Sequence, residues 1–272
     1  MLKMFDLPEP TNPGYSAIDP LDNRYFDPEV AKYLSEESRI TYQAYVETAL
    51  AHTLAKHGIC TPEIASQIEE AAKKVKAAAV YEAEKTTKHD IKALVNTIKS
   101  ELSDEAKPYV HFGATSYDII ANAQVLQLRE VTSQFILPSL KTLLATLVNI
   151  ADKYAETPQI GRTHGQHGVP ITFGFSIALY VSRLGQSIKA TEELNNSLVG
   201  KFSGATGTYN ALSLFVSDPL QFEKDILEAI NLTPSEVSTQ ILPPEHLIRL
   251  IDEYTIAAGI LANIGHDMRH LQ

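Results

Sequence analysis

Three stretches with apolar residues at helical spacing constrain the fold of this chain more than any other feature. They lie within residues 140–154, 173–188 and 247–268, where apolar residues recur three or four positions apart. That spacing gathers them on one face of a helix, which must be covered by another helix. The last stretch alternates by four and three, as a seam in a helical bundle does. The members of that expected seam are Leu247, Ile251, Tyr254, Ala258, Leu261, Gly265 and Met268.

Shorter helices are expected before these long ones. Residues 35–57 form one that Gly58 ends, and Thr61 and Pro62 open another that runs to about residue 76. Pro138 should break or kink a helix over 117–154. We see no strand-rich region and no solenoid repeat. The fold class is therefore all-α, with a short-helix N-terminal domain in residues 1–112 and a long-helix bundle domain in residues 113–272.

The last helix is expected to begin near Pro244 and is still running at Gln272 without a capping signal. It would be about 28 residues, or roughly 40 Å long. A natural domain seldom ends in this way. We therefore expect the bundle to be truncated here and the natural protein to be longer.

Composition narrows the classes of function. The 272 residues carry a formal net charge of −10, which argues against non-specific nucleic-acid binding. The single Cys60 cannot form an internal disulfide, as is usual in a reducing cytosol. No apolar run approaches membrane-spanning length, and prolines and acidic residues interrupt the first 15 residues. We expect a soluble, cytoplasmic protein with neither nucleic acid nor a membrane as partner.

Residues 161–170 differ from the helical stretches on either side. They read Gly-Arg-Thr-His-Gly-Gln-His-Gly-Val-Pro. His164 stands between Thr163 and Gly165, and imidazole is the side chain most readily tuned to exchange a proton near neutral pH. This pattern is typical either of an active-site loop or of a polar turn between helices that exposes one histidine.

Two further segments combine polar side chains with an expected helix start. In residues 86–90, Thr87 and Asp90 have capping-box spacing, which puts Lys88 and His89 where free amides and the helix dipole attract anions. In residues 115–118, a Thr-Ser cap precedes Asp118 and offers two hydroxyls to an oxyanion. Each segment is equally an ordinary helix cap.

Two other candidates are weaker on residue type alone. Arg24 and Tyr25 stand side by side, and an Arg with a phenol suits a phosphate or a carboxylate, although an exposed Arg in an irregular arm is the commoner case. The glycine-rich residues 200–210 follow a helix and lack the Lys-Ser/Thr ending of a phosphate-binding loop.

Three of these segments together resemble a known family. Residues 86–93, 111–119 and 161–166 occur in the order found in adenylosuccinate lyase, a member of the fumarase/aspartase superfamily. Residues 22–25, 204–210 and 238–241 fit the same family, and the likeness covers nearly the whole chain. Fumarases and argininosuccinate lyases share the general plan, but the His89-Asp90 pair and Gly165 favour the adenylosuccinate branch.

The resemblance implies a reaction and roles for residues. Fumarate would be eliminated from adenylosuccinate, giving AMP, and from the succinylated aminoimidazole carboxamide ribotide of purine biosynthesis, with no cofactor or metal. A base removes a proton beside a carboxylate, donors hold the developing charge, and an acid protonates the departing nitrogen. By resemblance His164 is the general acid, and His89 contacts and positions the substrate. The implied substrate-binding residues are Arg24, Tyr25, Lys88, Asp90, Thr115, Ser116, Thr163 and Gln240, with Asn210 as a weaker candidate.

The chain departs from the family pattern in two places. The family's base is a serine on a glycine-rich loop, and neither that loop nor the third domain is in these 272 residues, so we expect little turnover from this chain alone. His167 and Gly168 replace the usual Pro-Ala, and we expect no substrate contact from His167. The superfamily's active form is a homotetramer whose sites take residues from three chains, and uncovered apolar stripes are consistent with that assembly.

Other classes of function stay open. A metal-dependent hydrolase could use His164, His167, His89 and His111, but glycines and the lack of a nearby carboxylate disfavour it. A non-catalytic helical scaffold would keep the fold without the chemistry. Within the superfamily, an argininosuccinate lyase or a cycloisomerase is the nearest enzyme alternative.

Overall fold

The computed structural model describes residues 2–7 and 22–271 and divides into two compact units. The first unit comprises Met1–Val131 and Leu198–Pro244, and the second comprises Thr132–Ser197 and Glu245–Gln272. The chain thus leaves the first unit after Val131 and returns to it for residues 198–244. The domain boundary expected at residue 112 rests on a change of helix length and stays a prediction.

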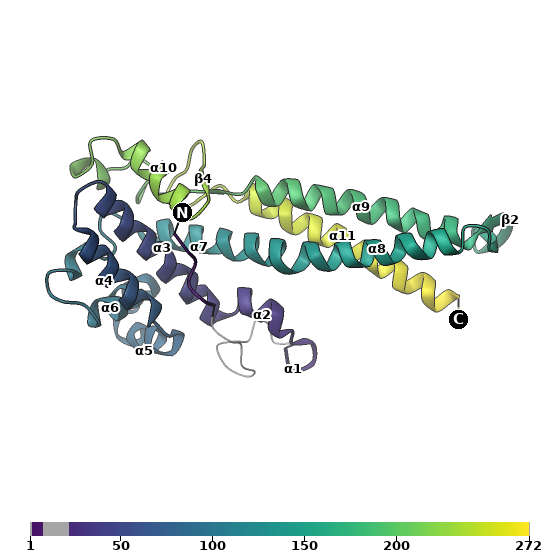
Figure 1. Cartoon of the computed structure of the whole chain (residues 1–272), viewed down its shortest axis with the longest axis horizontal. Helices are drawn as coiled ribbons and strands as arrows, with labels where there is room; N and C mark the ends of the chain where they lie inside the picture. The colour runs from purple at the N-terminus through teal and green to yellow at the C-terminus, as the bar shows by residue number, and fades with distance from the viewer. Residues whose placement is uncertain (1, 8–21, 272) are drawn as a thin grey trace. The chain divides into compact units, whose positions relative to one another are not determined.

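The first unit is built of helices of mixed length and two very short strands (Figure 1). Its elements are α1 (Asp22–Tyr25), α2 (Pro28–Leu34), α3 (Glu36–Lys56), α4 (Pro62–Lys73), α5 (Ala77–Thr87), α6 (Asp90–Ser100), η1 (Lys107–Tyr109), α7 (Ser116–Val131), β3 (Val199–Gly200), η3 (Leu212–Leu214), α10 (Pro219–Ala229) and β4 (Thr233–Pro234). The central element is α3, which packs against α2, α4, α7 and α10. Most of its residues are buried, Tyr42 and Leu50 completely.

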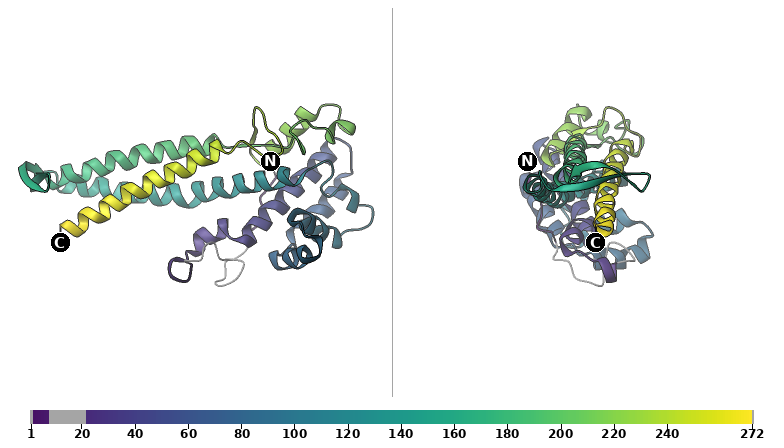
Figure 2. Two further views of the ribbon diagram at one scale, coloured as in Figure 1. Left: turned by 180° about the vertical axis from the view of Figure 1, so that it is seen from behind. Right: turned by 90° about the vertical axis from the view of Figure 1, so that its right-hand side faces the viewer.

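Three long helices form the second unit: α8 (Leu137–Lys153), α9 (Phe173–Asn196) and α11 (Glu245–His270). In the left view of Figure 2 they run along the same direction, and α9 packs against both α8 and α11. Leu140, Leu147, Leu184 and Ile188 lie in the core of this unit, so the first two apolar stretches are confirmed. The π-helical turn η2 (Thr132–Ile136) precedes α8 and marks the irregularity expected at Pro138.

The face of α11 that packs in the second unit is not the predicted seam. Leu250, Ala257 and Ile260 are buried, whereas Ile251 and Met268 of the expected seam are 47% and 65% exposed. The predicted seam is thus not covered by this chain itself, because α11 carries apolar residues on more than one face. Periodicity finds such faces, but it does not say which of them the chain itself covers.

The segment expected to be an irregular loop is a β-hairpin. Strands β1 (Pro158–Thr163) and β2 (Gln166–Thr172) pair antiparallel, with Thr163 opposite Gln166, so the turn consists of His164 and Gly165. Both turn residues have positive φ, 54° and 69°, as the tightest hairpin turns require. The fold class is nevertheless all-α, as predicted, because the described strands are few and short.

One helical stretch meets the length and composition criteria of a membrane span, contrary to the sequence expectation. Ser116–Lys153 has a window of mean hydropathy 1.3, of which 17% is buried. Length and composition are the whole of this observation, and core helices pass the same test. Within the second unit the α8 part of the stretch buries Leu140 and Leu147 against α9 and α11.

Candidate active site

The connection between α5 and α6 holds His89 in a defined position. Thr87 is the last residue of α5, and Lys88 ends that helix in the left-handed conformation, with φ 53°. His89 is then the N-cap of α6, and the N–H of Lys92 donates to its Nδ1 at 3.3 Å. The expected cap at Thr87 was therefore wrong by two residues. An imidazole nitrogen supplies the acceptor that Ser, Thr or Asp usually provides.

The cap contact has a consequence for the protonation of His89. When Nδ1 accepts from Lys92, a neutral imidazole carries its proton on Nε2. That nitrogen lies 3.3 Å from Oγ of Ser116 and can donate to it. Oδ1 of Asp90 is 3.2 Å from Nδ1 and also accepts from the N–H of Ile91 at 2.7 Å. A doubly protonated ring would exchange the cap contact for an ion pair with Asp90.

The start of α7 is anchored by a buried ion pair. Asp118 and Lys201 are both fully buried, and their side chains form a salt bridge. Asp118 also accepts from the N–H of Thr115 at 2.9 Å and from that of Gly204 at 3.3 Å. The expected partnership of Thr115 and Asp118 is therefore present. The Asp118 carboxylate also holds the loop that begins at Lys201, through its contacts with Lys201 and Gly204.

Lys201 is a residue that the sequence reasoning missed. Asn122 supports it by accepting from the backbone N–H of Lys201 at 3.1 Å and donating to its carbonyl oxygen at 2.7 Å. Through these contacts α7 and the glycine-rich loop are joined next to Thr115. The available signal was a lysine inside an otherwise apolar and glycine-rich segment.

Glu47 and His111 form a second missed pair. The buried carboxylate of Glu47 contacts Nδ1 of His111 at 2.6 Å and accepts from the backbone N–H of His111 at 3.1 Å. Burial by itself would lower the pKa of His111, but the Glu47 carboxylate outweighs burial, and the pKa is raised above its ordinary value. This pair holds His111 at φ 63°, just before the segment that carries Thr115 and Ser116.

The glycine-rich loop and the 238–240 segment lie against each other. Gly207 has φ 78°, and a Cβ there would collide with the backbone of Ser238. The hydroxyls of Ser203 and Ser238 are 2.7 Å apart. These contacts place Gln240, which is exposed, beside the loop that carries Asn210. The side chain of Asn210 is occupied within its own loop, where it accepts from Thr206 at 3.2 Å and from Thr208.

Arg24 and Tyr25 form the end of the short helix α1. The guanidinium carbon of Arg24 lies 5.7 Å from the centroid of the Tyr25 ring, within range of a cation–π contact. Both side chains are exposed, Tyr25 by 68%. Of the rest of the expected arm, residue 1 and residues 8–21 lie outside the described residues. Arg24 and Tyr25 thus share a surface position, as their sequence adjacency requires.

His164 and Thr163 stand at the tip of the hairpin in the second unit. Both are exposed, and neither side chain makes a hydrogen bond or an ion pair with any other residue in the described part of the chain. A pocket of about 670 Å³ lies beside the hairpin and is lined by Gly161, Arg162 and Gly165 together with residues of α9 and α11. His164 itself is not part of that lining.

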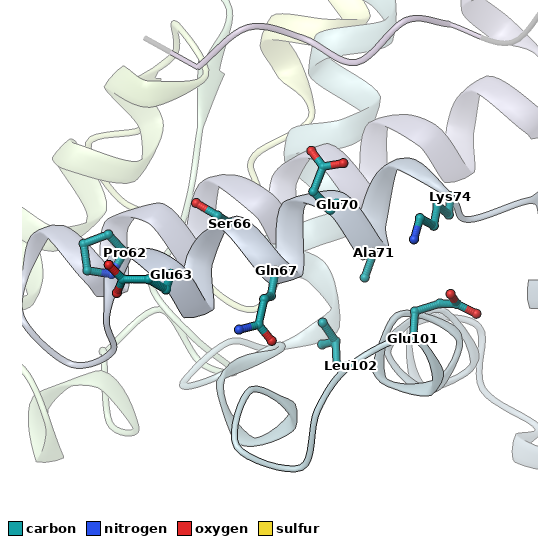
Figure 3. A pocket seen from close by; sticks show the side chains of 9 residues that line it. All are labelled: Pro62, Glu63, Ser66, Gln67, Glu70, Ala71, Lys74, Glu101 and Leu102. Atoms are coloured by element: carbon teal, nitrogen blue, oxygen red, sulfur yellow. The ribbon is translucent and has the colours of Figure 1, made fainter.

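A pocket along α4 contains none of the predicted residues. It measures about 560 Å³ and lies along α4, where Glu63, Glu70 and Glu101 outnumber the single Lys74 (Figure 3). Its excess of carboxylates makes it a poor place for an anion. Among residues 2–7 and 22–271, no three His, Cys, Asp or Glu side chains are grouped as metal ligands.

These features together define a helical protein whose interhelical segments carry histidine, lysine and hydroxyl side chains. The sequence profile of the Lyase family matches residues 25–272. The chain belongs to this family, which lies within the fumarase/aspartase superfamily that the sequence motifs resemble.

Curated relatives agree with this assignment. The chain is 36% identical over 256 residues to an adenylosuccinate lyase of Archaeoglobus fulgidus, covering 94% of this chain and 56% of the relative. It is 33% identical to an adenylosuccinate lyase of Methanocaldococcus jannaschii, with 94% and 55% covered. An N-acetyl-S-(2-succino)cysteine lyase of Enterococcus italicus is 30% identical, with 92% and 54% covered. The chain thus spans little more than half the length of these relatives.

Solved structures show the same fold. A fumarate lyase from Mesorhizobium sp. BNC1 superimposes with a TM-score of 0.83 at 27% identity, covering 90% of this chain and 57% of that one. A 3-carboxy-cis,cis-muconate lactonizing enzyme from Pseudomonas putida gives 0.82 at 29% identity, with 91% and 56% covered. The similarity extends over both compact units of the chain.

Proposed function

We propose that this protein eliminates fumarate from adenylosuccinate, leaving AMP, and from the related succinylated ribotide of purine biosynthesis. Membership of the lyase family and the 33–36% identity to archaeal adenylosuccinate lyases support the reaction class. The observation that carries the proposal is the contact between His89 and Ser116. It unites two motifs that lie 27 residues apart in the sequence beside the buried anchor Asp118.

The chemistry assigns a task to each group. Elimination breaks a carbon–nitrogen bond while a proton leaves the carbon beside a carboxylate. In this proposal Thr115 and Ser116, at the N-terminus of α7, hold the carboxylate whose charge develops, because hydroxyls and free amides there stabilise an oxyanion. His89 positions the substrate from the facing helix start, and Lys88 and Asp90 flank it.

His164 is the proposed general acid that protonates the departing nitrogen, with Thr163 beside it. Its exposed position on a two-residue turn gives a bound substrate access to the imidazole. Arg24 and Tyr25 are assigned to the nucleotide phosphate, and Gln240 to the substrate beside the 204–210 loop. The general base is not assigned to any of these residues.

The active form is proposed to be a cytoplasmic homotetramer whose sites combine residues from several copies. Exposed apolar side chains on α11, such as Ile248, Ile251 and Met268, support an assembly through this helix. The net charge of −10 leaves the local cations as the groups that attract an anionic nucleotide.

The test is fumarate release by the native gene product, followed as product formation from adenylosuccinate. Argininosuccinate and an S-succinocysteine serve as parallel substrates, since both would also yield fumarate. Release from adenylosuccinate at a far higher rate than from the other two is the expected result. Preference for either parallel substrate would overturn the proposed specificity, and no release from any of them would favour a scaffold.

A further inference from the structure

A third pocket adjoins the His89–Ser116 contact and lies wholly within the first unit. It has a volume of about 510 Å³, which is within the usual range for small-molecule sites. Residues of α6 line one side, and the segment around His111 and Phe112 lines another. His89 and Ser116 both belong to the lining, so the pocket is continuous with the site described above.

The α6 side of the pocket carries two lysines without counter-ions. Lys92 and Lys99 are seven residues apart, which places them on the same face of the helix two turns from each other. Neither makes an ion pair with any carboxylate in residues 2–7 and 22–271. Burial lowers the pKa of Lys99, the charge of Lys92 lowers it further, and Glu47 opposes both. The positive charges of Lys92 and Lys99 thus line the same pocket.

His111 offers the pocket a third donor. Its Nδ1 is taken by Glu47 at 2.6 Å, which leaves Nε2 as the ring's other donor. The Glu47 carboxylate is engaged by the imidazole and the backbone N–H of His111, and it does not line the pocket. Asp118, which also acts on His111, is paired with Lys201. The two lysines therefore give the pocket a net positive charge.

We propose that this pocket is an oxyanion site, in which Lys92, Lys99 and Nε2 of His111 bind a phosphate or carboxylate group next to Ser116. The contrast with the pocket along α4 is one of charge, because carboxylates predominate there and cations predominate here. Neither lysine has a role in the proposed elimination. The inference rests on the pocket and its charges, and it holds whichever substrate the enzyme prefers.

The experiment is calorimetric titration of the native gene product with inorganic phosphate and, separately, with fumarate, at constant ionic strength. We expect saturable binding of at least one of these anions. Lys99→Met should weaken it at least about tenfold, the usual scale for losing a hydrogen bond to a charged group. Lys92 is exposed, so Lys92→Met should weaken binding without disturbing the fold and serves if Lys99→Met does not fold.

The matched control is Lys76→Met, which removes one exposed positive charge away from every described pocket and should leave binding unchanged. Absence of saturable binding, or equal losses in Lys76→Met and both pocket variants, would overturn the proposal. If phosphate or fumarate also raises the KM for adenylosuccinate competitively, the natural occupant is an anionic group of the substrate. If KM is unaffected, the occupant is a free anion.

The two proposals can fail separately. Binding that depends on Lys99 in a protein that releases no fumarate would reject the proposed function and keep the oxyanion site. Fumarate release without any anion binding that depends on Lys92 or Lys99 would keep the proposed function and reject the oxyanion site.

Discussion

The two histidines of the candidate site are held in opposite ways. His89 is the N-cap of α6, contacts Ser116, and stands near the buried Asp118–Lys201 pair that anchors the start of α7. His164 occupies the tip of a two-residue hairpin turn and has no side-chain partner in the part of the chain that the structure describes. One position is fixed by side-chain contacts, and the other by backbone geometry alone.

This difference indicates that the part of the site around His89 is ordered before a ligand binds, whereas the side chain of His164 is not. Rotamers locked by hydrogen bonds need little further ordering on binding, whereas an exposed side chain loses its freedom only when a substrate or another copy of the chain covers it. We therefore expect substitutions around His89 to affect folding as well as function. Substitutions at His164 should affect function alone.

The largest effect is expected at the anchor of the first region. Lys201→Met leaves Asp118 buried and uncompensated, which should lower the free energy of unfolding by about 3–5 kcal/mol. Chemical denaturation measures this change. Lys224→Met is the control, because Lys224 pairs with Glu228 on an exposed helix face at 3.9 Å and should cost under about 0.5 kcal/mol. Similar losses in both variants would show that the buried pair does not anchor the fold.

The second largest effect is expected on the rate of fumarate release when His164, in the turn of the hairpin, is replaced. His164→Ala in the native gene product should reduce the rate of fumarate release by roughly a hundredfold or more, the scale of a lost general acid. Its free energy of unfolding should stay within about 0.5 kcal/mol, because the imidazole is exposed and makes no hydrogen bond or ion pair in the described part of the chain. His167→Ala, two residues into β2, should retain the parent rate. Full activity in the His164 variant would remove that residue from the mechanism.

A third, smaller effect tests whether backbone geometry holds the hairpin. Gly165→Ala forces a Cβ into the left-handed region at φ 69°, which costs about 1–2 kcal/mol even though the surrounding space is open. Gly185→Ala in α9 also meets open space, but at a helical position, and should stabilise the protein by about 0.5–1 kcal/mol. Thermal unfolding of the two variants should therefore shift in opposite directions. Parallel shifts would contradict the turn geometry.

The smallest effect is a pH dependence in the first region. Because Glu47 raises the pKa of His111 above 6.5 despite burial, the stability that this pair contributes is complete below about pH 6.5 and is lost as pH rises through the folded-state pKa. A proton NMR titration of His111 should show the raised pKa in the parent protein and a lower one in Glu47→Gln. Glu105→Gln, an exposed change, should not move it. A pKa of His111 that is the same in all three proteins would exclude the assigned cause.

Much of the helical fold was predictable because its signals are local. Thr61 and Thr172 cap the helices that follow them, and the stripes within 140–154 and 173–188 form the core of the second unit. The hairpin was missed because its glycines hide the alternation that marks a strand. Which face of α11 the chain itself covers was not predictable, because apolar residues occupy more than one of its faces and only packing selects among them.

The site divides in the same way between what local sequence can encode and what it cannot. The motifs that carry His89, Ser116 and His164 are contiguous segments, so residue type and spacing alone were enough to single them out. The partners Lys201 and Glu47 lie 83 and 64 residues from the groups they contact, and no local pattern marks them.

The sequence by itself determined most of the helices, several of their caps and the polar segments between them, since these depend on contacts within a few residues. Only the tertiary structure decided which charges are buried together, which face of α11 is covered, and which lysines remain unpaired around a pocket. Burial and charge pairing depend on chain segments that meet only after folding, and that is the physical reason for the division.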